Sequence, residues 1–165
     1  MSITIRRAEI KDLPTIVKIY NQAVVDGIAT DDDQPITANE RQDWFNQFND
    51  HYPIWVAENF PGNICGWCDL APCWDHHVYD QSAELSIYID KDAQRQGVGQ
   101  AFLNHIDNAI AAGLTFKTVV AYIYERNLPS QKLFAKCGYQ HWGQLKNIAY
   151  VNDELRSLEI YGKNY

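Results

Sequence analysis

Seven segments of the chain have the apolar or alternating pattern that predicts β-strands. They are Ile3–Arg7, Ile54–Glu58, Ile64–Leu70, Ala83–Ile89, Thr118–Tyr124, Gln140–Gln144 and Leu155–Tyr161. Ala83–Ile89 reads AELSIYI and alternates almost strictly, which is typical of a strand with two different faces. Thr118–Tyr124 is a continuous apolar run, so we expect a strand that is buried on both faces.

Apolar residues at helical spacing predict four helices between these strands. The helices are expected to begin at Asp12, at the capping box of Thr37 and Glu40, near Val98 and at Pro129. A polar and acidic stretch, 26–35, is expected to form a loop after the first helix. This order predicts a mixed α/β fold, with a central mixed sheet and helices on both faces, in a single domain over residues 1–165.

Composition and charge narrow the possible partners. The net charge is −7, with 14 Lys and Arg against 21 Asp and Glu, and no cluster of basic residues occurs. An acidic chain of this kind is repelled by nucleic acid and by anionic membranes, so we expect neither as a partner. The apolar runs are too short for a transmembrane helix and the first residues do not resemble a secretory signal, so a cytoplasmic location is expected.

Cys65 and Cys68 form a C-x-x-C pair, and His76 and His77 follow closely. A zinc site is therefore one interpretation. However, the two cysteines lie in a predicted strand, where residues three apart point to opposite faces and do not converge on one ion. We expect thiols that pack as small apolar side chains, and no metal.

The segment QRQGVG, from Gln94 to Gly99, joins a predicted strand to a predicted helix. Glycine lets a ligand approach the backbone closely, and the free N–H groups at the start of a helix point outward together. Such an arrangement suits a pyrophosphate group. An ordinary helix start with two glycines would give the same pattern, so the segment alone leaves both interpretations open.

A second strand-to-helix turn carries Asn127 and Ser130. Taken alone, these residues are typical of helix caps. Together with QRQGVG, however, the turn resembles the GNAT superfamily of acetyltransferases. The family has an acetyl-CoA signature Q/R-x-x-G-x-G/A after a strand, followed by an N-x-x-S/A turn and a helix that ends in G-F/Y. The matching residues are Gln94, Gly97, Gly99, Asn127, Ser130, Gly138 and Tyr139.

Within that superfamily the chain is similar to the phosphinothricin and methionine sulfoximine N-acetyltransferases. The similar segments are RRAEIKDLPTIVKIYNQAV, PITANERQDWF, PIWVAE, GNICGW, AELSIYI and NLPSQKLFAKCGY. They are spread over essentially the whole chain. The resemblance implies the GNAT fold, acetyl-CoA as cosubstrate, a homodimer, and transfer of acetyl to the amine of a small amino-acid analogue.

The resemblance also implies which residues hold acetyl-CoA. The backbone of Ile87–Ile89 would pair with the pantetheine arm like a further strand, and the main chain from Arg95 to Gln100 would hold the pyrophosphate. The full set expected to bind the cofactor is Ile87, Tyr88, Ile89, Arg95, Gln96, Gly97, Val98, Gly99, Gln100, Asn127, Ser130 and Lys132.

Glu84 is the residue that the resemblance implies as general base. An amine attacks a thioester only when it is unprotonated, and free amines are mostly protonated at pH 7. A carboxylate in an apolar strand can accept the proton directly or through water. From the residues alone, a glutamate facing solvent is the more common situation.

Two departures from the family pattern concern the thiol and the substrate. Phe134 stands where many members have a Tyr or His that protonates the departing thiol, so the thiolate leaves unaided or another tyrosine serves. In the mid-chain loop, relatives often carry an arginine suited to a substrate carboxylate, and here a histidine is the candidate replacement. The residues expected to bind substrate are Asp33, Trp74, His76, His77 and Tyr79.

Other functions stay open from the sequence. The acidic run Asp31–Asp33 suits a cationic substrate, so a polyamine, an aminoglycoside or a protein N-terminus is an alternative acceptor. From a different class, Phe134 and the missing arginine are compatible with a CoA-binding sensor that has lost its chemistry.

Overall fold

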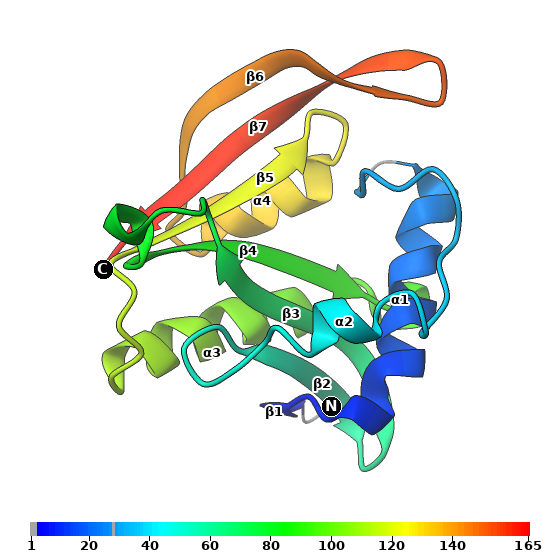
Figure 1. Cartoon of the computed structure of the whole chain (residues 1–165), viewed down its shortest axis with the longest axis vertical. Helices are drawn as coiled ribbons and strands as arrows, with labels where there is room; N and C mark the ends of the chain where they lie inside the picture. The colour runs from blue at the N-terminus through cyan, green and yellow to red at the C-terminus, as the bar shows by residue number, and fades with distance from the viewer. Residues whose placement is uncertain (1–2, 28) are drawn as a thin grey trace.

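A computed structural model describes residues 3–27 and 29–165 (Figure 1). Ile28, inside the predicted acidic loop, lies outside the described residues. Seven strands form one sheet in the order β1-β2-β3-β4-β5-β7-β6. They are β1 (Thr4–Arg7), β2 (Ile54–Phe60), β3 (Asn63–Pro72), β4 (Ser82–Ile89), β5 (Thr118–Tyr124), β6 (Gln140–Val151) and β7 (Glu154–Asn164).

Four α-helices cover the two faces of this sheet. They are α1 (Leu13–Asp26), α2 (Gln42–Phe45), α3 (Val98–Ala111) and α4 (Leu128–Lys136). Helices α3 and α4 pack on one face around Phe102 and Phe134, while α1 and α2 pack on the other around Ile16 and Phe45. The predicted element order and the mixed α/β class, with helices on both faces, are confirmed. No helix in the described part of the chain is long and apolar enough to cross a membrane.

Neighbouring strands are antiparallel everywhere except between β4 and β5. That parallel pairing is short, because only Ser82–Glu84 pairs with Thr118–Val120. Beyond this point β4 continues to Ile89 and β5 to Tyr124 without pairing to each other. The sheet therefore opens between its two central strands, and Figure 1 shows β4 and β5 diverging.

The cysteine pair on β3 corrects one prediction. Cys65 and Cys68 were expected on opposite faces of the strand, but both are buried in the cluster beneath α3. The reason is a β-bulge: Ala57 pairs with Gly66 while Glu58 pairs with Ile64, so Cys65 is the extra residue. Burial raises the pKa of both thiols, as expected of cysteines that pack as apolar side chains.

One predicted helix start and one predicted cap bond differ from the structure. The bonds of the capping box are present, since the Thr37 N–H donates to Glu40 and the Glu40 N–H to Thr37. They close a turn, however, and α2 begins only at Gln42 and lasts a single turn. At the start of α1 the Asp12 carboxylate is held by the Arg6 guanidinium and the Glu9 N–H, and it makes no cap bond to the helix.

The last two strands are longer than predicted. They form a hairpin along one edge of the sheet, coloured orange and red in Figure 1. Most of β6 is exposed, including the apolar side chains of Trp142, Leu145, Ile148 and Tyr150. Most of β6 lacks the apolar alternation of a buried strand, so the predicted strand ended at Gln144 instead of Val151.

Replacement of Gly66 by alanine is expected to destabilise the fold. A Cβ there would lie 3.0 Å from the Tyr88 backbone oxygen and within 3.3 Å of Phe102 and Val98, so α3 would have to move off the sheet. We expect Gly66→Ala to lower the free energy of unfolding by about 1–3 kcal/mol, measured by urea denaturation. Gly143→Ala is the matched control, because a Cβ at Gly143 meets nothing within 4 Å. Equal stability of the two variants would contradict this account of the packing.

Candidate functional site

The opening between β4 and β5 leaves one edge of β4 without a partner strand. Past Glu84, the backbone of Leu85–Ile89 pairs with β3 on one side and with no described strand on the other. An edge of this kind offers N–H and C=O groups to an extended ligand, which can bind as an added strand. The opening is therefore suited to a narrow, extended molecule that lies between the two strands.

One end of the opening widens into a cavity of about 510 Å³, which we call the cofactor cavity. The start of α3 forms one wall, where Gly97 occupies the N-cap position with φ of 88°. Arg95, two residues earlier, also has a left-handed backbone with φ of 61°. The first N–H groups of α3 have no carbonyl partner within the helix, so they are free to bind an anion. Pyrophosphate fits such a nest of backbone donors.

Most of the residues predicted to hold the cofactor line this cavity. They are Ile87, Tyr88, Ile89, Arg95, Gly97, Val98, Gly99, Gln100, Asn127 and Ser130. Two others do not line it. The Gln96 side chain donates to the Asp92 carbonyl, and Lys132 is exposed on α4. Asn127 does act as a helix cap, accepting from the Ser130 N–H at 3.3 Å, so the capping and the cavity-lining roles coincide in one residue.

A second cavity of about 380 Å³ lies on the side of the sheet covered by α1 and α2, and we call it the acceptor cavity. Its walls come from α1, the loop after α1, α2, α4 and the strands β3, β4, β5 and β7. The lining residues include Glu84 of β4, Asp69 of β3 and Tyr122 of β5. Both cavities share Ile87, Tyr88 and Phe134 as lining residues. The two cavities therefore meet along β4 at Ile87 and Tyr88, within the opening between β4 and β5.

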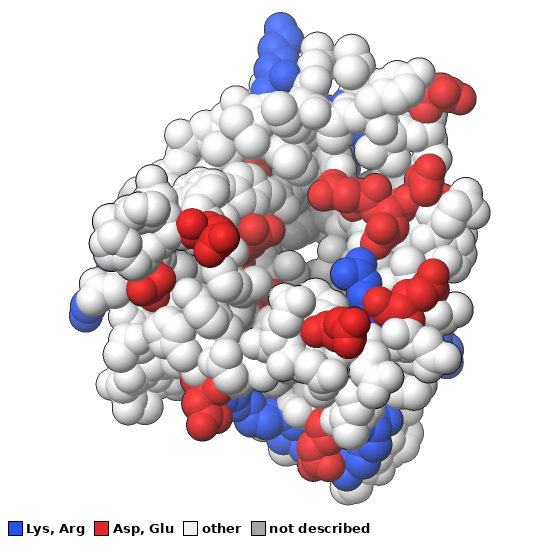
Figure 2. Space-filling view, viewed as in Figure 1, with Lys and Arg blue, Asp and Glu red and all other residues white. Residues whose placement is uncertain are grey.

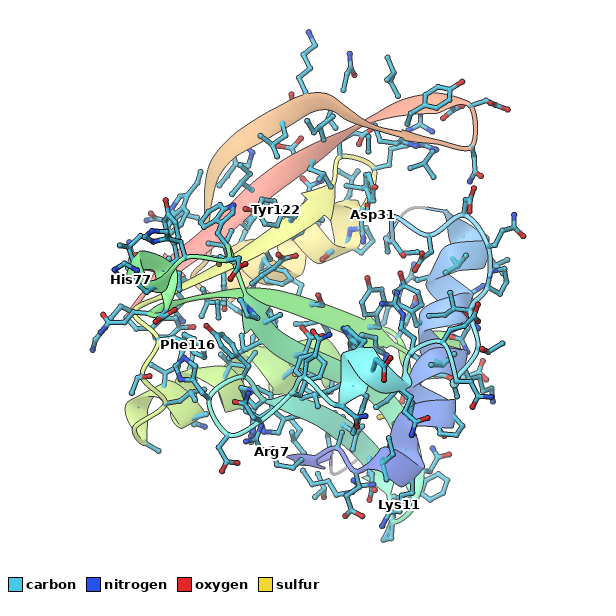
Figure 3. The ribbon with its side chains drawn as sticks, in the orientation of Figure 1. Arg7, Lys11, Asp31, His77, Phe116 and Tyr122 are labelled. Carbon is cyan, nitrogen blue, oxygen red and sulfur yellow. The ribbon has the colours of Figure 1, made fainter. Side chains whose placement is uncertain are left out.

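The loop after α1 closes the acceptor cavity and is attached by tyrosine hydroxyls. Tyr124 of β5 donates to the Asp31 carboxylate, and Tyr20 of α1 bonds to Thr30 and to the Asp32 carboxylate. Tyr88 of β4 donates to the Ala29 carbonyl at 3.1 Å. In Figure 3 Asp31 and Tyr122 lie on opposite sides of the space between the loop and β5. These bonds connect the acidic loop to both strands that form the opening.

Glu84 stands at the last paired position of β4, where the strands begin to diverge. Its side chain is half-buried, lines the acceptor cavity and makes no hydrogen bond to any described residue. Burial, and then the Asp31 carboxylate, raise the pKa of Glu84 above its ordinary value. A carboxylate with a raised pKa and an open lone pair is chemically suited to accept a proton.

Asp69 is a second carboxyl group in this cavity, and sequence reasoning missed it. It is 4% exposed, and its Oδ1 atom has no hydrogen-bond partner among the described residues. Burial, and then the nearby Glu84, raise the pKa of Asp69 to about 8, against hydrogen bonding from Ser86, which lowers it. The sequence does contain an indication of it, because Asp69 is a charged residue inside the otherwise apolar segment CGWCDLA. The strand prediction treated Asp69 as an ordinary polar position.

Arg41 is the cation of the acceptor cavity, and the sequence analysis gave it no role. Its guanidinium forms an ion pair with Asp32 at 2.9 Å and lies over the rings of Tyr20 and Trp44, at 5.2 and 5.5 Å from their centroids. Figure 2 shows acidic side chains gathered around the central hollow, with a basic group among them. An arginine held in this way can bind a planar anion such as a carboxylate.

The residues predicted to bind substrate do not line either cavity. Asp33 is exposed in the loop, next to the cavity-lining Asp31 and Asp32. Trp74, His76, His77 and Tyr79 form an exposed aromatic cluster between β3 and β4. Figure 3 shows His77 at the far end of the molecule from Asp31. The structure thus brings Glu84 together with Asp31, Asp32, Arg41 and Asp69 instead of with the mid-chain loop.

Comparison with known proteins identifies the family. A family model described as an acetyltransferase (GNAT) domain matches residues 2–140. The chain belongs to the GNAT acetyltransferase family. Among its relatives, the Bacillus subtilis protein YwnH is 35% identical over 98% of both chains. A Pseudomonas aeruginosa L-methionine sulfoximine/L-methionine sulfone acetyltransferase is 32% identical over 90% of this chain and 86% of its own.

Solved structures of GNAT proteins show the same fold. A GNAT superfamily phosphinothricin acetyltransferase from Sinorhizobium meliloti, in complex with AcCoA, has a TM-score of 0.91 and 25% identity, covering 99% of this chain and 89% of that chain. The GNAT resemblance and the GNAT fold expected from the sequence are therefore confirmed, and the chain is an acetyltransferase.

Asp69→Asn is expected to stabilise this GNAT protein near pH 7. Because the pKa of Asp69 is raised, the unfolded chain releases this proton at lower pH than the folded chain does, so the wild type loses stability as pH rises from about 4 to about 8. The asparagine variant has no such loss. We expect its free energy of unfolding at pH 7 to exceed that of the wild type by about 1 kcal/mol or more.

Urea denaturation at several pH values measures this difference, which should shrink towards zero near pH 4. Asp43→Asn removes the same charge from an exposed position on α2 and should give no comparable gain. A lower stability of Asp69→Asn than of the wild type at pH 7 would contradict this account, because it would mean that interactions in the folded chain offset the cost of burying the Asp69 carboxylate.

Proposed function

We propose that this chain transfers the acetyl group of acetyl-CoA to the primary amine of a small molecule, with Glu84 as general base. The observation that carries the proposal is the meeting of the two cavities at Ile87 and Tyr88, in the opening between β4 and β5, with Glu84 lining the acceptor cavity farther back along β4. A thioester reaching this point from the cofactor cavity and an amine reaching it from the acceptor cavity would be placed side by side, which is the main requirement of direct transfer.

The residues that line the cofactor cavity suit acetyl-CoA in their chemistry, and they follow one another along the cavity in the same order as the parts of the cofactor that they would bind. Backbone donors from Arg95 to Gln100 would hold the pyrophosphate, and the free edge of β4 at Ile87–Ile89 would pair with the pantetheine amides. Relatives support this assignment, since the Sinorhizobium meliloti protein was solved in complex with AcCoA. Lys132 stays a proposed contact for the adenosine end.

In the proposed reaction, Glu84 accepts the proton of the amine as its nitrogen bonds to the acetyl carbonyl carbon. Unpaired N–H groups of β4 are positioned to stabilise the oxyanion, and the carbon–sulfur bond then breaks to release the CoA thiolate. No covalent intermediate with the chain is required. Phe134, buried at the junction of the cavities, cannot protonate the thiolate. Tyr122 is our candidate, since it lines the acceptor cavity, and burial and then the nearby Glu84 raise its pKa, which keeps its hydroxyl protonated.

For the acceptor, we propose a small molecule of the amino-acid type. The support is the similarity to methionine sulfoximine and phosphinothricin acetyltransferases, together with Arg41, which supplies a cation for a carboxylate. Arg41 takes over the part that the sequence analysis assigned to a histidine of the mid-chain loop. The exposed cluster of Trp74, His76, His77 and Tyr79 stays a prediction, as does Asp33.

We also propose a homodimer, with residues 1–165 of each copy as one domain. The exposed apolar side chains of β6 support this proposal, because they lie on the outermost strand of the sheet. An unpaired edge strand with exposed apolar side chains is usually covered by another chain.

Gly97→Val tests the cofactor assignment. A β-branched residue disfavours φ of 88°, so the start of α3 would rearrange and the N–H groups would no longer converge. We expect calorimetry to show that acetyl-CoA affinity falls at least about tenfold, the range for losing one or more bonds to a charged group. Gly113→Val, at a glycine with φ of 121° at the other end of α3, controls for backbone strain and should keep its affinity. Unchanged affinity in a folded Gly97→Val variant would refute the assignment.

Glu84→Gln tests the general base. We expect turnover to fall by about a hundredfold or more, with little change in acetyl-CoA affinity. The base works only when ionised, so wild-type activity should fall as pH falls through the raised pKa of Glu84. In Asp31→Asn, which removes one cause of that raised pKa, this acidic limb should move to lower pH. Near-wild-type turnover of Glu84→Gln at pH 7 would remove Glu84 from the mechanism.

A further inference from the structure

Asp69 is a buried carboxyl group to which the proposed chemistry gives no task. It lines the acceptor cavity, is 4% exposed, and its Oδ1 atom lacks a hydrogen-bond partner in the part of the chain that the structure describes. A buried carboxyl group without a partner costs free energy of folding, so such groups are rare unless a ligand uses them.

The other charges of the acceptor cavity are already engaged with one another. Arg41 pairs with Asp32 at 2.9 Å, and the Tyr124 hydroxyl donates to Asp31. Asp69 and Glu84 are the two lining carboxyl groups that are engaged by neither Arg41 nor a tyrosine hydroxyl. The Asp69 Oδ1 atom and the Trp67 Nε1 atom have no hydrogen-bond partner among the described residues. The cavity therefore has more acidic than basic groups, as the acidic rim of the hollow in Figure 2 also shows.

The sheet register places these two carboxyl groups on the same face. Asp69 pairs with Ser86 across β3 and β4, and Ala71 pairs with Glu84. Asp69 and Glu84 are thus diagonal neighbours, and such positions are about 7–8 Å apart along an antiparallel pair. Two nitrogens joined by an extended chain of four carbon atoms lie about 6 Å apart, given single bonds of about 1.5 Å, which is of the same order. The aromatic walls of Trp44, Trp67 and Tyr88 also favour a cation.

We propose that Asp69 binds a second cationic group of the acceptor. The substrate is then a small amine that carries an ammonium or guanidinium group in addition to the amine that is acetylated at Glu84. A basic amino acid and a diamine both meet this description. Because the pKa of Asp69 is raised in the folded chain, binding of the cation releases the proton that Asp69 holds near pH 7. This inference rests on the proposed acetyl transfer beside Glu84.

Two matched pairs of acceptors test the charge alone. L-arginine and L-citrulline have the same shape and one primary amine each, but only arginine carries a cationic head group. Putrescine and n-butylamine form a smaller pair that differs by one ammonium group. In the wild type we expect kcat/KM to favour the cationic member of at least one pair by about tenfold or more, the range for a hydrogen bond to a charged group.

In Asp69→Asn, this preference should fall to about unity, because the ion pair that distinguishes the two members of each pair is lost. Asp43→Asn, on the exposed side of α2, is the control with the same charge change and should keep the wild-type preference. The proposal is wrong if the wild type prefers the neutral member in both pairs, or if the preference survives in Asp69→Asn.

Failure of the underlying function gives a different result. If no amine is acetylated although acetyl-CoA binds, the proposed transfer is wrong. Calorimetry with arginine and citrulline on the wild type and Asp69→Asn then still tests the cation site. Tighter binding of arginine that is lost in the variant supports the site, and equal binding of both ligands to the wild type overturns it.

Discussion

The backbone of β4 beyond Glu84 has no partner strand on one side, because β5 turns away from it after Val120. Unpaired strand groups inside a sheet are costly unless something else satisfies them. Here the surrounding elements keep the opening in place. Helix α3 anchors β4 from one face, and the tyrosine hydroxyls of Tyr88 and Tyr124 attach the loop after α1 to both diverging strands. Both cavities, the free strand edge and the position of Glu84 follow from this single divergence.

The sequence predicted those parts of the fold and of the site that depend on local patterns of residues. The order of strands and helices along the chain, the glycines at the start of α3 and the alternation around Glu84 each follow from patterns within a few residues, because backbone geometry repeats with a fixed period. The order of the strands in the sheet depends on pairing between distant segments, and it was not predicted. The short length of α2 could not be predicted, since a capping box such as that at Thr37 can close an isolated turn as well as start a helix. The bulge at Cys65 depends on the pairing of β2 with β3, which one strand's sequence does not reveal.

The acceptor cavity was hardest to predict, because its charged residues come from segments that are distant in the sequence. Arg41 precedes α2, Asp69 lies in β3, and the two meet only when α1, α2 and the sheet are packed together. The sequence did indicate the acidic loop, but it gave no reason to choose Asp31 and Asp32 over Asp33. Only the folded chain shows that Tyr20 and Tyr124 turn the first two inward. The buried acid at Asp69 is also a cost to stability, and proteins commonly retain such costs at sites that serve binding.

The shared wall between the cavities determines how two ligands are handled. Tyr88 and Phe134 belong to both cavities, and so do Ala29, Asn127 and Ser130. The start of α3 lines only the cofactor cavity, while Arg41, Asp69 and Glu84 line only the acceptor cavity. In the proposed reaction each ligand has wall residues that the other lacks, so neither must leave before the other arrives. The proposed direct transfer would then pass through a ternary complex, with steady-state kinetics that are sequential rather than ping-pong.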